Sequence, residues 1–92
     1  MPTATARHIL VATEQEVDNL INHLNTGKSF EELARMYSKC PSKAKGGDLG
    51  EFGPGQMVRE FNDVCFGDSE LNESLKVKTQ FGWHLVQVTS RM

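Results

Sequence analysis

Hydrophobic residues recur at helical spacing in three parts of this chain. Between Thr13 and Gly27 an apolar stripe follows the spacing i, i+3, i+4, i+7 and consists of Val17, Leu20, Ile21 and Leu24. Thr13 followed three residues later by Glu16 forms a capping box, which is a typical start of a helix. Glycine is a typical residue just after a helix ends. The pattern therefore predicts a helix that begins after Thr13 and ends at Gly27.

Two more helices follow from the same periodicity. Ser29 and Glu32 form a second capping box. The stripe behind it consists of Phe30, Leu33, Ala34 and Tyr37. Pro41 prevents this helix from continuing, because proline lacks the backbone donor and clashes with the preceding turn. The third stripe is spaced i, i+4, i+7, i+8 and consists of Met57, Phe61, Val64 and Cys65.

The remaining apolar segments are typical of strands. Arg7–Thr13 is β-branched and apolar on both faces, which predicts a central strand. Asp48–Gly53 and Ser74–Thr79 are shorter candidates. The alternation within Phe81–Ser90 predicts the last strand, and its residues on one face are His84, Val86 and Val88. The order strand, two helices, strand, helix, two strands indicates an α+β domain with a mostly antiparallel sheet.

Composition and charge narrow the class of protein. The chain has 92 residues, of which 38% are hydrophobic and 24% are charged, so we expect residues 1–92 to form a single domain with a small core. The net charge of −2 argues against nucleic acid or an acidic membrane as the main partner. No apolar run approaches membrane-spanning length, and the start, MPTATARHIL, lacks the features of a secretory signal. We therefore expect a cytoplasmic protein whose Cys40 and Cys65 are reduced.

Five glycines surround Pro54 in the stretch GGDLGEFGPGQMVREF, residues 46–61. A phosphate-binding loop requires G-x-x-x-x-G-K-[ST], or G-x-G-x-x-G ahead of a helix, and neither spacing is present. Pro54-Gly55 fits a type II turn. The other glycines of this stretch allow bends or the close approach of a neighbouring backbone.

Two histidines on predicted strands and one cysteine before a proline are candidates for chemistry: His8, His84 and Cys40. They could ligate zinc together, but they lack a paired-ligand motif such as C-x-x-C or H-E-x-x-H. A Cys–His nucleophile is a second alternative, although no motif surrounds Cys40 and no oxyanion donor is evident. The plainest interpretation is that each histidine is a hydrogen-bonded core residue.

Three stretches resemble, in the same order, the parvulin family of peptidyl-prolyl cis/trans isomerases: RHILV, FEELARMYSKCPSKAKGGDLGEFGPGQMVREF and VKTQFGWHLVQV. The resemblance covers nearly the whole chain. It implies a four-stranded antiparallel sheet surrounded by three to four helices, with the first and last strands adjacent at its centre. It also implies a monomeric isomerase that needs no cofactor or metal and acts on proline-containing polypeptides that are unfolded or flexible.

The resemblance assigns roles to eight residues. Four would form the pocket for the substrate proline ring: Leu49, Met57, Phe61 and Phe81. Four would form the catalytic centre: His8, Cys40, Thr79 and His84. Within that centre the histidines are expected to be paired and neutral, with the Thr79 hydroxyl beside them and the Cys40 thiol facing the susceptible amide. Phe61 is expected at the rim, so that Phe61→Ala would lose activity and stay folded.

The chemistry of X-Pro rotation fits such a site. The barrier is about 18–20 kcal/mol, and the twisted amide loses resonance together with much of its charge separation. An apolar, water-poor site therefore favours the twisted amide over the planar one. No bond is made or broken, so neither a proton shuttle nor a covalent intermediate is needed. The alternative is a non-catalytic peptide-binding or chaperone module on the same fold.

Two segments depart from the family pattern. VATEQE follows the first strand, where phospho-directed members carry a basic cluster, so no preference for phosphoserine before proline is expected. The stretch DSELNE lacks the usual glycine-containing turn, which leaves the path into the third strand open. Lys39, Lys43 and Lys45 are expected to be solvated and to steer acidic substrates at most mildly.

Overall fold

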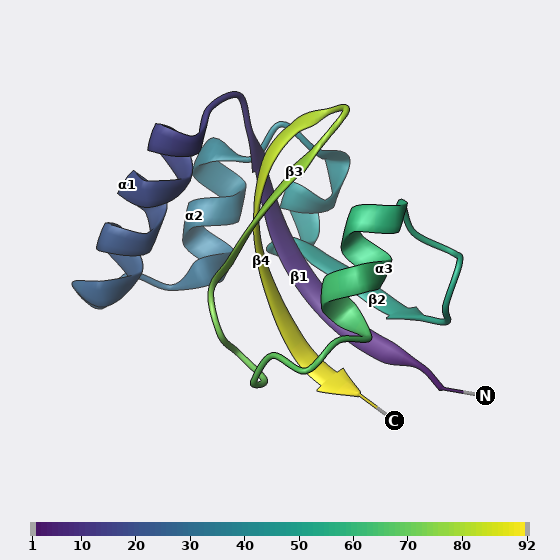
Figure 1. The fold of residues 1–92 in the computed structure, drawn as a ribbon. Coiled ribbons are helices and arrows are strands. Elements are labelled where there is room, and N and C mark those ends of the chain that lie inside the picture. The colour runs from purple at the N-terminus through teal and green to yellow at the C-terminus, as the bar shows by residue number, and fades with distance from the viewer. Residues whose placement is uncertain (1, 92) are drawn as a thin grey trace.

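The computed structural model describes residues 2–91 and contains the predicted elements in the predicted order (Figure 1). The four strands are β1 (Ala4–Val11), β2 (Asp48–Phe52), β3 (Leu75–Thr79) and β4 (Gly82–Arg91). The helices are α1 (Glu14–Asn25), α2 (Phe30–Tyr37), α3 (Arg59–Cys65) and the short 3₁₀ helix η1 (Pro41–Lys45). The 3₁₀ helix is the one element that the sequence pattern did not predict.

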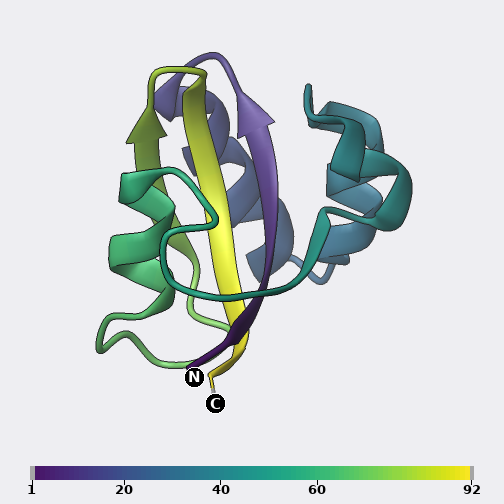
Figure 2. The same ribbon diagram turned by 90° about the vertical axis from the view of Figure 1, so that its right-hand side faces the viewer.

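The strands form one antiparallel sheet in the order β2-β1-β4-β3. The first and last strands are therefore neighbours at the centre, which confirms the expected α+β architecture. Their pairing runs from Ala4 opposite Arg91 to Val11 opposite Trp83. Figure 2 shows that the two chain ends consequently lie at the same end of the sheet.

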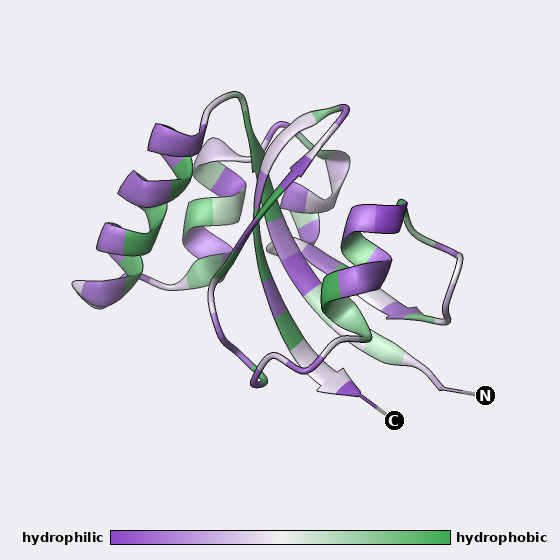
Figure 3. Cartoon of the chain, in the orientation of Figure 1, coloured by the Kyte–Doolittle hydropathy of each residue, from purple (hydrophilic) through white to green (hydrophobic). Residues whose placement is uncertain are grey.

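The two faces of the sheet are covered by different helices. α1 and α2 lie on one face and α3 on the other (Figure 1). Figure 3 shows that α1 turns its apolar side toward the rest of the molecule and its polar side outward. The core beneath α1 and α2 contains Ile9, Val11, Val17, Leu20, Phe30, Leu33, Ala34 and Leu85. The core beneath α3 contains Ala4, Ala6, Phe52, Phe61, Cys65, Val77, Val86 and Val88.

Both predicted helix caps are confirmed. The Thr13 hydroxyl accepts a hydrogen bond from the backbone N–H of Glu16 at 3.2 Å, so α1 begins directly after Thr13. The Ser29 hydroxyl accepts one from the N–H of Glu32 at 3.1 Å at the start of α2. Each bond satisfies a donor that the first helical turn leaves unpaired.

The predicted starts of two elements are wrong by two or more residues. β1 spans Ala4–Val11 rather than Arg7–Thr13, because Thr13 serves as the cap of α1 and the strand extends backward to pair with β4. α3 begins at Arg59, which leaves Met57 in the loop before the helix. α2 ends at Tyr37, before Pro41, as predicted. Pro41 instead begins the 3₁₀ helix, where its missing N–H and fixed φ suit the first position.

The path into β3 is fixed by backbone hydrogen bonds rather than by a glycine turn. Asn72 adopts the left-handed conformation with a φ of 65°, which asparagine tolerates better than most residues. Its N–H donates to the Val88 carbonyl at 2.7 Å. The Arg91 guanidinium donates to the Cys65 carbonyl at 2.7 Å and also to the carbonyl of Ser69. β4 thus holds the irregular segment that follows α3.

Gly47 shows why the loop before β2 is rich in glycine. Its φ is +88°, and a Cβ at this position would lie 2.5 Å from the His8 carbonyl oxygen. The His8 N–H in turn donates to the Gly47 carbonyl at 2.9 Å. Only glycine permits this close approach to the centre of β1. The loop therefore lies directly against the strand that carries His8.

Candidate functional site

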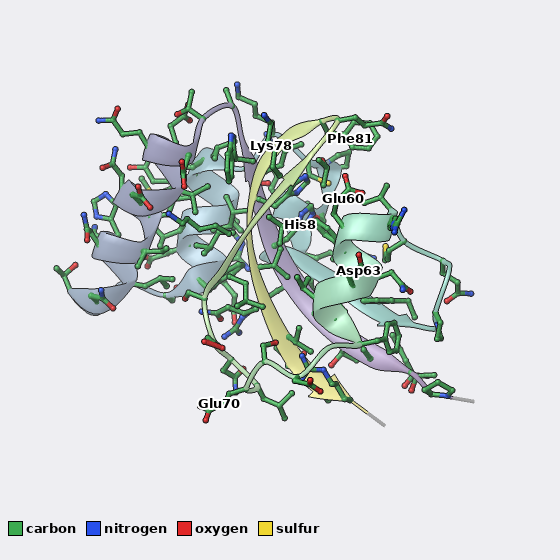
Figure 4. The ribbon with its side chains drawn as sticks, viewed as in Figure 1. His8, Glu60, Asp63, Glu70, Lys78 and Phe81 are labelled. Carbon is green, nitrogen blue, oxygen red and sulfur yellow. The ribbon has the colours of Figure 1, made fainter. Side chains whose placement is uncertain are left out.

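A cavity of about 340 Å³ opens between α3, η1 and the turn that joins β3 to β4. Figure 4 shows His8, Glu60 and Phe81 around this region. The cavity is lined by seven of the eight residues singled out in the sequence: His8, Cys40, Leu49, Met57, Phe61, Phe81 and His84. Thr79 does not line it but contacts His84 from behind. The fold thus brings together side chains from β1, η1, β2, α3 and β4.

His8 and His84 are neighbours, as predicted. Residue 8 on β1 pairs with Val86 and residue 84 on β4 pairs with Leu10, so the two histidines lie diagonally on one face. Their Nδ1 atoms are 3.1 Å apart. The rings stack with centroids 5.2 Å apart and an interplanar angle of 16°. Both side chains are buried, so the pair forms the polar floor of the cavity.

A chain of hydrogen bonds extends from this pair to both walls. The His8 Nε2 atom is 3.1 Å from the Ser42 hydroxyl on η1. The His84 Nε2 atom is 2.7 Å from the Thr79 hydroxyl, which also accepts the N–H of Phe81 at 3.1 Å. Five groups are therefore linked in series from η1 to the β3–β4 turn. Ser42 is a member of this chain to which the sequence analysis assigned no role.

Burial keeps both histidines neutral near pH 7. Desolvation of the charged form, with the His84 charge adding to it, lowers the pKa of His8 to about 4. Desolvation also lowers the pKa of His84, against a smaller opposing pull from the Glu60 carboxylate. In a neutral pair one of the two facing Nδ1 atoms carries a hydrogen and the other accepts it. The pair is thus a satisfied hydrogen bond rather than a proton reservoir at this pH.

Phe61 packs its ring edge-on against both histidines. Its centroid lies 5.3 Å from that of His8 and 4.7 Å from that of His84. Only 4% of Phe61 is exposed, and it belongs to the core beneath α3. The expectation of a rim aromatic is therefore wrong, because the ring lies at the inner end of the cavity. Removing it would cost about 3–5 kcal/mol of stability.

The cavity rim is formed by Met57, Val58 and Phe81. Phe81 is 63% exposed and Val58 is 37% exposed, and both still line the cavity. Leu10, Pro41 and Lys39 complete the lining, and the sequence analysis missed their place in it. The alternation along β1 could have indicated Leu10, which shares its face with His8. No comparable signal exists for Lys39, because nothing local tells which way a loop lysine points.

The two other chemistries weighed for His8, His84 and Cys40 find little support in the geometry. All four ring nitrogens of the histidines have hydrogen-bond partners, and Cys40 is not among them. Neither histidine of the pair therefore contacts the thiol as a base, as a Cys–His nucleophile would require. Within residues 2–91, no group of three His, Cys, Asp or Glu side chains is arranged to hold a metal ion. Nor does any helix in that range combine the length and apolar character needed to cross a bilayer.

The fold and the site match one family. The family model described as PPIC-type PPIASE domain matches residues 3–92. The chain belongs to this family of peptidyl-prolyl cis/trans isomerase domains, the parvulins.

The most similar proteins include foldases and a single-domain parvulin. The chain is 47% identical over 89 residues to foldase protein PrsA 1 of Bacillus cereus, covering 96% of this chain and 31% of that protein. The crystal structure of the peptidylprolyl isomerase PrsA from Bacillus anthracis matches with a TM-score of 0.91 and 38% identity, over 99% of this chain and 42% of that one. NmPin, the parvuline of Nitrosopumilus maritimus, matches with a TM-score of 0.85 and 30% identity, over 98% of both chains. The chain thus spans about a third of the length of the curated relatives it matches first.

Proposed function

We propose that this chain is a peptidyl-prolyl cis/trans isomerase that acts on proline-containing segments of unfolded or flexible polypeptides. The observation that carries the proposal is the cavity itself. Its walls are almost entirely apolar, and its floor is a buried, neutral histidine pair. A cavity of about 340 Å³ is large enough for a proline ring and the amide before it.

The proline ring would lie against Leu49, Met57 and Phe61. These side chains come from β2, the loop before α3, and α3 itself, and they line the cavity from its inner end at Phe61 to its rim at Met57. With the ring held, the preceding carbonyl can rotate while the rest of the peptide stays at the exposed rim near Phe81. The apolar walls disfavour the planar amide, whose oxygen and nitrogen carry more charge than those of the twisted amide. Rotation becomes faster because the site supports the twisted state more than the planar state.

The histidine pair would position the two walls of the cavity rather than transfer protons. Ser42 on η1 and the Phe81 N–H on the β3–β4 turn are the two ends of the hydrogen-bonded chain. Holding both ends fixes the width of the cavity between them. Thr79 belongs to this support, since its hydroxyl joins His84 to the turn. Cys40 would lie beside the rotating carbonyl as a weakly polar neighbour, with no bond formed to it.

A coupled protease assay on short Ala-Pro peptides tests the proposal. The wild-type protein should accelerate cis-to-trans conversion. Met57→Ala should lower kcat/KM about ten- to hundredfold, since a methionine contact that the bound proline ring buries is worth about 1.5–3 kcal/mol. Met36→Ala is the matched control, because Met36 is 64% exposed on α2 and does not line the cavity. A folded wild-type protein without any acceleration would defeat the catalytic proposal and leave a peptide-binding module.

The proposal extends to partners and compartment. Both cysteines are free thiols on separate elements, which suits a reducing compartment such as the cytoplasm. The net charge of −2 gives no general attraction for nucleic acid.

We expect a monomer, which light scattering of the purified protein at working concentration would test. The phosphoserine expectation also stays a prediction, as the loop between β1 and α1 carries no basic residue.

A further inference from the structure

Lys39 introduces a positive charge into an otherwise uncharged cavity wall. Its N–H donates to the Leu10 carbonyl at 2.9 Å, which anchors its backbone beside the end of β1. Its side chain is exposed and lines the cavity directly before Cys40. The other lining side chains within residues 2–91 are apolar, a thiol or the neutral histidines. A substrate in the cavity therefore meets one charged residue, which lies beside Cys40 and η1.

The Lys39 ammonium is available to a ligand. The ion pairs within residues 2–91 are made by Arg59 and Lys76, and no carboxylate there pairs with Lys39. Lys45, on the same segment, instead lines a separate cavity together with Glu31 and Asp48. Lys43 is exposed and lines neither cavity. The three lysines of this segment are thus not equivalent, although the sequence presents them as one solvated group.

We propose that Lys39 is a specificity-determining residue that favours an acidic side chain immediately before the proline. This inference rests on the proposed function, in which the carbonyl before proline lies beside Cys40. We expect the side chain of the residue that carries this carbonyl to project toward the neighbouring wall, which includes Lys39. A carboxylate there gains a cationic partner, and a lysine or arginine there meets repulsion.

A carboxylate on α3 lies near the cavity without lining it. Glu60 is exposed in the first turn of α3 (Figure 4), and it is not among the residues that line the cavity. Its carboxylate is near enough to act on the charge of His84. Lys39 is therefore the charged residue in the lining within residues 2–91, and it favours an acidic over a basic residue before proline.

The expected preference is modest, because the partner is solvent-exposed. Exposed ion pairs contribute little, which corresponds to a preference of about two- to fivefold. Salt should weaken it, since the Debye length shrinks from about 30 Å at 0.01 M to about 3 Å at 1 M.

The test compares two peptides that differ only in charge, with Glu-Pro and Gln-Pro in the same flanking sequence. At low salt the wild-type ratio of kcat/KM should be about two to five in favour of Glu-Pro. Lys39→Gln should bring the ratio to about one, and Lys39→Glu should reverse it. Lys43→Gln is the matched control, because it removes the same charge from the same segment outside the cavity, and it should keep the wild-type ratio. High salt should reduce the wild-type ratio toward one.

Three outcomes would overturn the inference: a wild-type ratio of one or less, a ratio unchanged in Lys39→Gln, or equal losses in Lys39→Gln and Lys43→Gln. Its failure can be distinguished from failure of the proposed function, because the latter would show as no acceleration of either peptide. In that case NMR titration with the same two peptides measures the same ratio as relative affinity. For a binding module, the Glu-Pro to Gln-Pro affinity ratio should change among the variants in the same way as predicted for kcat/KM. A ratio that does not change in this way would refute the role of Lys39.

Discussion

The two faces of the sheet are built differently although both are covered by helices. On one face α1 and α2 bury mainly aliphatic and aromatic side chains, and the buried Gln87 of β4 on that face accepts hydrogen bonds from Arg7. On the other face α3 is only seven residues long and covers the sheet incompletely. The uncovered part is where the histidine pair and the cavity lie.

Because of this difference, the α1–α2 face contributes mainly to stability, and the α3 face carries the candidate site. The α1–α2 face can be packed tightly because nothing must enter it. The α3 face keeps polar groups buried near the centre of the sheet, and every one of them must be hydrogen-bonded to be tolerated. No buried side-chain nitrogen or oxygen within residues 2–91 lacks a partner. The hydrogen-bonded chain from the Ser42 hydroxyl to the Phe81 N–H satisfies the buried polar groups beside the cavity.

Leu33→Ala should give the largest effect on the packed face. Leu33 is 1% exposed on α2, and removing such a side chain costs about 2–5 kcal/mol of unfolding free energy. The isomerase rate per folded molecule should stay close to wild type, because Leu33 contacts the face away from the cavity. Urea unfolding and peptide isomerisation, measured on the same sample, check both parts. A fivefold fall in rate per folded molecule would show that the two faces are not independent.

Low pH should have the second-largest effect, through the histidine pair on the α3 face. The pKa of His8 falls from 6.5 in the unfolded chain to about 4 in the folded protein, so the folded state binds fewer protons between these values. The unfolding free energy should therefore decrease as the pH falls through 6.5 toward 4, by about 3 kcal/mol from this group. Its stabilising effect is complete above pH 6.5.

Urea unfolding at several pH values, together with ¹⁵N shifts of the imidazole rings, would measure this dependence. The variant His8→Asn lacks the group, so its stability should fall less steeply over the same range. An identical slope in both proteins, or a His8 ring that titrates near 6.5, would show that the pair is not desolvated as the structure indicates.

Cys40→Ser should have the smallest effect. The thiol makes no contact with a base, so it needs only to be a compact, weakly polar neighbour of the carbonyl. We expect the activity to stay within about one to two decades of wild type, or about 1.4–2.7 kcal/mol of barrier. Cys40→Asp should also remain active. A folded but inert Cys40→Ser protein, with a substrate adduct trapped on wild-type Cys40 by mass spectrometry, would establish a covalent mechanism instead.

Local patterns predicted the α1–α2 face better than the α3 face. Thr13 and Ser29 fix two helix starts because a capping bond joins residues only three apart. The stripes behind them are strictly periodic, so the buried face of each helix follows. The pairing of β1 with β4 joins residues some 80 positions apart, and it was predicted through the family resemblance rather than from periodicity.

The remaining features depend on contacts that sequence spacing does not encode. β1 extends back to Ala4 because β4 offers a partner there, although alanine and threonine alone give a weak strand pattern. Asn72 replaces a glycine turn because Arg91 and Val88 hold the neighbouring backbone. Phe61 lies at the inner end of the cavity because α3 begins two residues after Met57 and turns the ring inward.

The pairing of Ala4 with Arg91 has a consequence for protein architecture. The two ends of the chain lie side by side at one end of the sheet (Figure 2), so the domain begins and ends at nearly the same place. Such a unit can be spliced into an exposed loop of a host protein without separating the host's own flanking residues by much. The fold is in this sense portable: a designer could graft residues 2–91 into another scaffold with short connectors. The host would then gain a cavity facing outward, away from the point of attachment.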